Sequence, residues 1–148
     1  MILEEADKTH LEEFVKLKQL DFKEYSKLIG KKINIRDAEI KKEFLRILSS
    51  KDEELLFAKD EKNHNLTGFI HIKIEQRFSR AKIEYVFVSQ KYRNKGIATA
   101  LMDKSFKIAQ LKRIKNILLN VDIKNVNAIK LYEKLGFKLN KYELKKII

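Results

Sequence analysis

The chain has 148 residues, a length that suits a single domain with one hydrophobic core. Hydrophobic residues make up 44% of it, with nine Phe and five Tyr, which excludes an intrinsically disordered polymer. The formal net charge is +12, and the lysines that produce it are dispersed along the chain. This charge fits a solvated lysine-rich surface, a nucleic-acid partner or the attraction of a polyanionic small molecule.

Several classes of protein and site are excluded by what the sequence lacks. Cysteine is absent, which rules out disulfides, thiolate metal sites and a cysteine acyl-enzyme. The histidines are scattered without ligand spacing, so we expect no metal. No apolar run approaches the ~20 residues of a membrane span, and the acidic N-terminal stretch does not resemble a signal peptide. We therefore expect a cytoplasmic protein with no membrane partner.

Helical patterns dominate the first third of the chain. The predicted order is a strand over residues 1–6, a helix over 9–20, a second helical piece over 21–32 and a helix over 37–50. Thr9 is a suitable N-cap, and Glu12 follows it at the spacing of a capping box. Gly30 is expected to end the second helical piece.

The spacing of the hydrophobic residues then changes to the pattern that is typical of strands. Strands are predicted over residues 53–60, 66–76 and 81–89, joined by polar turns at 60–65 and 77–80. In the middle strand, Ile70, Ile72 and Ile74 alternate with polar residues, a pattern typical of an antiparallel strand with one solvated face.

After Gly96 the apolar residues again have the spacing of a helix. The predicted order is a helix from Ile97 to Lys112, with Leu111 on its apolar side, then a buried strand over 115–123, a helix from Asn125 to Gly136 and a closing strand over 137–148. The sequence thus predicts a single domain over residues 1–148 with an α/β (α+β) fold and a mixed sheet.

A glycine-containing junction joins the strand over 81–89 to the helix that follows it. A helix N-terminus leaves backbone N–H groups free and carries the positive end of the helix dipole, so the junction is a candidate anion site. Gly96 permits a close approach to the backbone, and Arg93 and Lys95 add positive charge. An ordinary turn with basic flanks explains the same residues, and neither common nucleotide-binding loop is present.

Two segments together resemble the GCN5-related N-acetyltransferase (GNAT) family. The stretch RNKGIA, residues 93–98, matches the R/Q-x-x-G-x-G/A signature, and NVNAIKLYEKLGF, residues 125–137, is similar to N-x-x-A-x-x-x-Y-E-x-x-G-F. Both lie in the family's order and cover about residues 80–139. The resemblance implies a mostly antiparallel twisted sheet of six to seven strands, flanked by about four helices. It also implies two splayed parallel strands at the cofactor site.

The same resemblance implies acetyl-CoA as co-substrate. Its pyrophosphate is expected on the backbone amides of the loop, and its pantetheine arm on the preceding strand, where it slots between the two splayed strands. The amide near Val88 would then polarise the thioester carbonyl. The implied cofactor-binding residues are Val86, Phe87, Val88, Arg93, Asn94, Lys95, Gly96, Ile97, Ala98, Thr99 and Asn125.

The implied reaction is direct transfer of the acetyl group to a primary amine of a small molecule, protein or peptide. An alkylammonium has a pKa of about 10.4, so the acceptor must lose a proton before it attacks. We expect Glu84 to act as the base and Tyr132 to protonate the departing thiolate. His71, Glu75 and Tyr85 are reserve candidates.

Other interpretations remain open for individual residues. Alone, Tyr132 could be a core aromatic, Asn125 a plain helix cap and Glu84 an exposed strand-end carboxylate. Asn120 stands where the branch that acts on ribosomal protein N-termini has a glutamate, which argues against that branch. The region over residues 20–36 is expected to shape the acceptor site.

Two rival functions also remain open. One is a non-catalytic acyl-CoA-binding regulatory module on the same fold. The other, a nucleic-acid-binding domain, is disfavoured because no stretch clusters Arg and Lys with aromatic residues. The acceptor amine is unidentified, and we expect a monomer or a homodimer.

Overall fold

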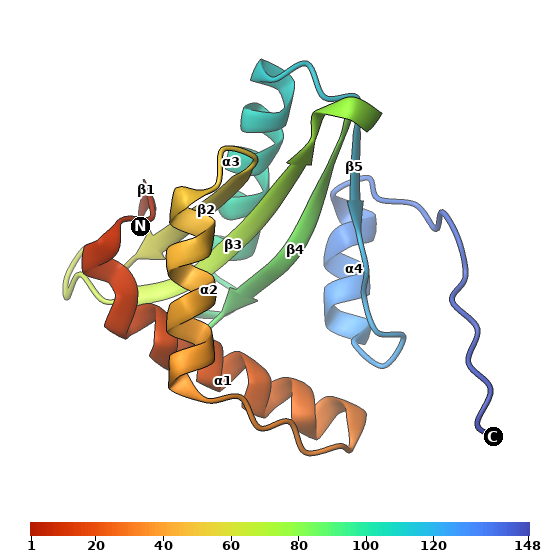
Figure 1. The fold of residues 1–148 in the computed structure, drawn as a ribbon, viewed down its shortest axis with the longest axis horizontal. Helices are drawn as coiled ribbons and strands as arrows, with labels where there is room; N and C mark the ends of the chain where they lie inside the picture. Colours follow the sequence, from red (N-terminus) through yellow and green to blue (C-terminus); the bar gives the residue numbers. More distant parts are fainter.

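The computed structural model describes residues 1–148 and places helices on both faces of a central sheet (Figure 1). Helices α1 and α2 cover one face, and α3 covers the other (Figure 1). The elements in chain order are β1 (Ile2–Glu5), α1 (Leu11–Ile29), α2 (Asp37–Ser49), β2 (Glu53–Lys59), β3 (Leu66–Glu75), β4 (Arg80–Val88), α3 (Ile97–Leu111), β5 (Asn116–Leu119) and α4 (Val126–Lys134).

The sheet has five strands in the order β1-β2-β3-β4-β5. The first four strands pair antiparallel with their neighbours, and β5 pairs parallel with β4. The connection from β4 to β5 runs through α3, as a parallel pair requires a crossover. The mixed, mostly antiparallel sheet and the four helices confirm the predicted architecture.

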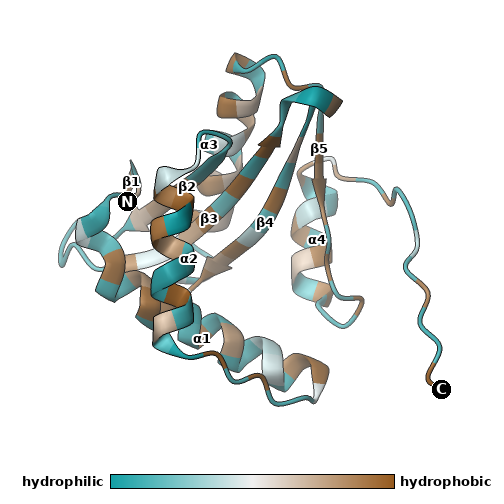
Figure 2. Cartoon of the chain, in the orientation of Figure 1, coloured by the Kyte–Doolittle hydropathy of each residue, from teal (hydrophilic) through white to brown (hydrophobic).

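The two faces of the sheet bury separate apolar clusters because side chains alternate along each strand. Phe57, Phe69 and Phe87 pack against α1 and α2, while Ile70, Ile72 and Leu101 belong to the cluster on the α3 side. Figure 2 shows hydrophobic and hydrophilic residues alternating along β3 and β4 and mixed along the helices that cover the sheet. No helix of the chain is both long and apolar enough to cross a bilayer.

The strand count was overestimated, because the closing strand predicted over 137–148 does not form. This segment leaves α4 as an extended tail that runs away from the sheet (Figure 1). A strand needs a partner for its backbone groups, and the neighbouring edge strand β5 offers only four residues. Leu139, Tyr142 and Leu144, which a strand would have half-buried, are exposed.

Three local predictions were also wrong. The helix predicted over 9–20 and the second piece predicted over 21–32 form one helix, α1 (Leu11–Ile29), because no helix breaker separates them, and Gly30 ends it as predicted. The capping box joins Asp7 and His10, since the Asp7 carboxylate accepts from the Thr9 N–H at 2.8 Å and the His10 ring accepts from the Asp7 N–H. Leu111 is 85% exposed because it lies in the last turn of α3, beyond the sheet.

A buried ion cluster ties α2 to the sheet and predicts acid-sensitive stability. The Glu53 carboxylate contacts Arg46 at 2.5 Å and His71 at 3.0 Å, and its side chain is only 6% exposed. The Arg46 guanidinium lowers the pKa of Glu53 from 4.5 to about 2. A depressed carboxyl pKa contributes stability that is present above pH 4.5 and is lost as the pH falls towards 2.

We expect Glu53→Gln to lower the free energy of unfolding by about 3 kcal/mol at pH 7. The difference from the parent protein should shrink as the pH falls from 4.5 to 2, as followed by urea denaturation. Glu54→Gln is the matched control, because Glu54 makes only a partly exposed contact with Lys112 at 3.6 Å. A pH-independent effect of Glu53→Gln would contradict this account.

Candidate active site

The sheet opens between β4 and β5. Their pairing runs from Arg80 opposite Asn116 to Ile83 opposite Leu119 and stops there. Strand β4 continues to Val88, so its residues 84–88 have no strand partner on the β5 side. Figure 1 shows the two strands side by side at one end and diverging towards the other. This confirms the splayed parallel pair, and it leaves an edge of unpaired backbone groups inside the fold.

A β-bulge in β4 accounts for where the opening begins. His71 pairs with Tyr85 and Ile72 with Ile83, so Glu84 has no partner on β3. An extra residue of this kind bends its strand and increases the local twist. Pairing with β5 ends at Ile83, immediately before the bulge. We therefore attribute the divergence of β4 from β5 to the bulge.

The strand residues implied as pantetheine contacts line this opening. Val86 is half-buried and packs on the α3 side, Phe87 is buried on the α1 and α2 side, and Val88 is buried at the strand end. Their side chains hold β4 to both clusters of the core. Their backbone has no strand partner on the β5 side, although the Val88 carbonyl accepts from Arg93, and a bound chain can therefore pair with the groups that remain.

The loop after β4 presents its backbone N–H groups outward. Asn94 and Gly96 both have positive φ, 59° and 77°, and Gly96 is the N-cap of α3. None of the turn, loop and cap hydrogen bonds uses the N–H groups of residues 94–99. A Cβ at Gly96 would meet no atom within 4 Å, so the space above the loop is open. Free amides at a helix N-terminus and around left-handed residues form a concave anion site.

The two basic side chains of the loop differ in their surroundings. The Arg93 Nε donates to the carbonyl of Val88 at 2.8 Å, and its guanidinium pairs with Glu24 on α1. Arg93 therefore fixes the loop between β4 and α1. Lys95 is exposed and makes only a contact with the face of Tyr92, 5.5 Å from its centroid, so its charge is available to an anion.

Asn125 and Tyr132, the two residues singled out in the second signature, lie at the start and near the end of α4. The Asn125 side-chain oxygen accepts from the Ala128 N–H at 3.3 Å, which confirms its role as a helix cap. Tyr132 packs edge-on against Phe137, with ring centroids 5.9 Å apart. Burial raises the pKa of Tyr132 to about 12, with a smaller contribution from the charge of Asp21 on α1.

The predicted base, Glu84, sits in the bulge. Its side chain is half-buried, and its carboxylate lies 3.7 Å from the ammonium of Lys82 on the same strand. Burial raises the pKa of the neighbouring Tyr85, with smaller contributions from the charges of Asp21 and Glu84. Of the reserve candidates, His71 stacks on Tyr85, whereas Glu75 is engaged with Arg80 at the far end of the strand.

The structure adds a buried ion pair that the sequence reasoning missed. Lys18 on α1 is only 6% exposed, and its ammonium lies 3.4 Å from Asp21 and 3.3 Å from the centroid of the Tyr85 ring. Burial lowers the pKa of Lys18 and raises the pKa of Asp21, and in each case the partner opposes the effect. The sequence did contain a clue to this pair: Lys18 lies among the apolar residues on one side of α1, at a position where leucine is usual.

Comparison with known proteins shows the family. The sequence profile of the acetyltransferase (GNAT) family matches residues 12–137. The chain belongs to this family. An N-alpha-acetyltransferase of Sulfurisphaera tokodaii is 33% identical over 99 residues, which cover 60% of this chain and 59% of the relative. The chain spans about half the length of the curated relatives it matches.

Solved structures show the same GNAT fold over the whole chain. A mutant BH1408 protein of Bacillus halodurans has a TM-score of 0.86 and 18% identity, with 100% of this chain and 99% of the other covered. AAC(6')-Iy in complex with a bisubstrate analogue that contains CoA has a TM-score of 0.80 and 18% identity, with 99% and 97% covered. At this identity the likeness supports the fold alone.

Proposed function

We propose that this GNAT-family chain transfers an acetyl group from acetyl-CoA to the N-terminal α-amine of a polypeptide. The observation that carries the proposal is that the family's loop, with its free amides, lies at the end of the strand edge that the sheet leaves open. The curated relatives named N-alpha-acetyltransferase support the α-amine as the acceptor.

The residues present fit acetyl-CoA. The amides of residues 94–99 would hold its phosphates, with Lys95 as supporting charge and open space above Gly96. The free edge of β4 would pair with the amide-containing pantetheine arm as a strand pairs with its neighbour. Bound there, acetyl-CoA supplies an activated acyl thioester, and the Val88 amide would stabilise charge on its carbonyl oxygen.

Two carboxylates are proposed as proton acceptors for the amine. Glu84 lies in the bulge of β4, where pairing with β5 has ended, and Asp21 on α1 pairs with Lys18, whose ammonium lies against the Tyr85 ring. We favour Asp21, because its pKa is raised by burial and a base works best when its pKa is near the working pH. The ammonium of Lys18 opposes this rise in the pKa of Asp21 and favours the charged carboxylate.

Tyr132 is proposed to protonate the departing thiolate. Its pKa of about 12 keeps the phenol protonated at neutral pH, as a proton donor must be. We expect Tyr132→Phe to lower kcat by about 100-fold while the Kd for acetyl-CoA changes less than about threefold. Steady-state kinetics and calorimetric titration measure the two quantities. An equal loss in both would contradict the acid role and leave Tyr132 as a packing residue.

Thiol release tests the proposed function most simply. The chain is incubated with acetyl-CoA and a panel of peptides and small amines, and free CoA thiol is followed with a chromogenic disulfide. The proposal predicts release that requires a peptide with a free N-terminal amine. Tight binding of acetyl-CoA without release across the panel would favour the regulatory module instead.

A further inference from the structure

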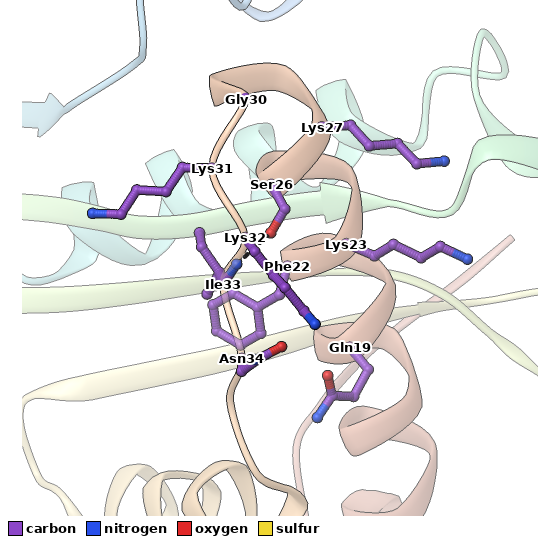
Figure 3. A pocket seen from close by; sticks show the side chains of 10 residues that line it. All are labelled: Gln19, Phe22, Lys23, Ser26, Lys27, Gly30, Lys31, Lys32, Ile33 and Asn34. Atoms are coloured by element: carbon purple, nitrogen blue, oxygen red, sulfur yellow. Dashed lines mark hydrogen bonds between the residues drawn. The ribbon is translucent and has the colours of Figure 1, made fainter.

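A hollow of about 390 Å³ lies beside the second half of α1, between the helix and the segment that leads to α2 (Figure 3). Lysines come from both walls: Lys23 and Lys27 from the helix, and Lys31 and Lys32 from the segment after it. Figure 3 shows the Lys32 side chain across the hollow, whereas Lys31 extends outward on one side and Lys23 and Lys27 extend outward on the other. We call these four residues the lysine cleft.

The sequence builds the cleft through the end of α1. Gly30 has a φ of 68° and ends the helix, with its N–H donating to the Ser26 carbonyl. The Ser26 hydroxyl then accepts from the Ile33 N–H at 3.0 Å, which turns the chain back along the helix. Gln19 donates to the Ile35 carbonyl at 2.7 Å and fixes the other end of the returning segment. These hydrogen bonds tie the returning segment to α1 at both ends of the hollow.

The charge of the cleft is uncompensated. None of its four lysines takes part in a salt bridge, whereas other lysines such as Lys18, Lys41 and Lys59 are each paired with a carboxylate. No acidic residue lines the hollow, and the remaining polar lining groups are the side chains of Gln19, Ser26 and Asn34. Four unpaired lysines border one concave surface, and their combined positive charge attracts an anionic group more strongly than an isolated lysine does.

Phe22 connects the cleft to the proposed site. It lines the cleft and also a second cavity of about 270 Å³, which is mostly apolar and whose wall includes Tyr85 of the open β4 edge. Lys27 lies about 14 Å along the helix axis from Lys18, which touches Tyr85. An extended peptide covers that distance in about four residues.

We propose that the lysine cleft binds acidic side chains of the acceptor polypeptide, about three to six residues from its acetylated N-terminus. This inference rests on the proposed function and adds the class of acceptor to it. The apolar second cavity would take an uncharged side chain nearer the amine. Nucleic acid fits the cleft less well, because its only aromatic lining residue, Phe22, is half-buried and offers no stacking platform.

The test compares peptides that share their first two residues and carry Glu, Gln or Lys at positions three to six. We expect kcat/KM for the Glu peptide to exceed that for the Gln peptide by about tenfold at low salt, with the Lys peptide lowest and the preference falling as salt rises. The double variant Lys27→Glu, Lys31→Glu should lose the preference. The matched control Lys104→Glu, Lys107→Glu, on the exposed side of α3, should retain it.

Each other outcome overturns the inference in a recognisable way. Equal rates for all three peptides would show that the cleft does not select the acceptor, and the proposed function would stand. Loss of acetyl-CoA affinity in the Lys27, Lys31 variant would assign the cleft to the co-substrate phosphates. Binding of a fluorescent single-stranded RNA that the same variant abolishes, without a peptide preference, would make it a nucleic-acid surface. Absence of transfer to every peptide would overturn the proposed function as well.

Discussion

Gly96→Glu is expected to lower the affinity for acetyl-CoA by about 100-fold, which corresponds to about 2.7 kcal/mol of binding free energy. Gly96 has a φ of 77° and caps α3 at the centre of the free amides. A glutamate there would place a carboxylate where the phosphates are proposed to lie, and like charges repel. Isothermal titration with acetyl-CoA measures the change.

The fold should survive this substitution, which makes the result interpretable. A Cβ at Gly96 meets no atom within 4 Å, so the cost is the left-handed backbone, about 1–2 kcal/mol. Gly136→Glu is a matched control, because Gly136 also has a positive φ, 89°, and equally open surroundings. It introduces the same charge and strain at the end of α4. An unchanged affinity in Gly96→Glu, or an equal loss in Gly136→Glu, would show that the loop does not hold the phosphates.

Asp21→Asn is expected to lower kcat by about 100-fold or more at pH 7, and Glu84→Gln to lower it by less than about tenfold. The reason is that burial raises the pKa of Asp21, and its partner Lys18, 3.4 Å away, lies against the Tyr85 ring of β4. An acceptor that is already neutral, such as a peptide hydrazide, should bypass most of the loss because no proton has to be removed first. A loss that is equal for both acceptors would indicate a structural role for Asp21.

Lys18→Met gives an independent pH test of the same assignment. The ammonium of Lys18 opposes the burial that raises the pKa of Asp21, so removing it raises that pKa further. A base is active when deprotonated, and the acid limb of the profile of kcat against pH should therefore move to higher pH. A profile that does not move, or that moves to lower pH, would contradict a base at Asp21. A larger loss in Glu84→Gln than in Asp21→Asn would instead support the base expected from the sequence.

The sequence was sufficient for the parts of the site that depend on local geometry. The junction at Gly96 follows from a strand running into a helix, and Asn125 caps α4 as its residue type indicates. The length and partners of the strands were less predictable. The tail after Phe137 has a strand-like composition, but whether it pairs depends on an available sheet edge, which no local pattern encodes.

The acceptor side could not be derived, because it depends on contacts between distant segments. Lys18 and Tyr85 are far apart in the sequence, and the α1 position of Lys18 reads as part of an apolar stripe. The bulge at Glu84 is likewise a property of the pairing between β3 and β4. The lysines after Lys23 appeared as ordinary dispersed charge until the turn at Gly30 brought them around one hollow.

The central claim is that this chain moves an acetyl group from acetyl-CoA to an N-terminal α-amine. Tandem mass spectrometry of a peptide with a free N-terminus and an internal lysine, incubated with the chain and acetyl-CoA, tests it most directly. The account predicts a single acetyl group on the α-amine, formed in proportion to the thiol released. Acetylation confined to the lysine side chain, or an unmodified peptide beside fully bound acetyl-CoA, would contradict it.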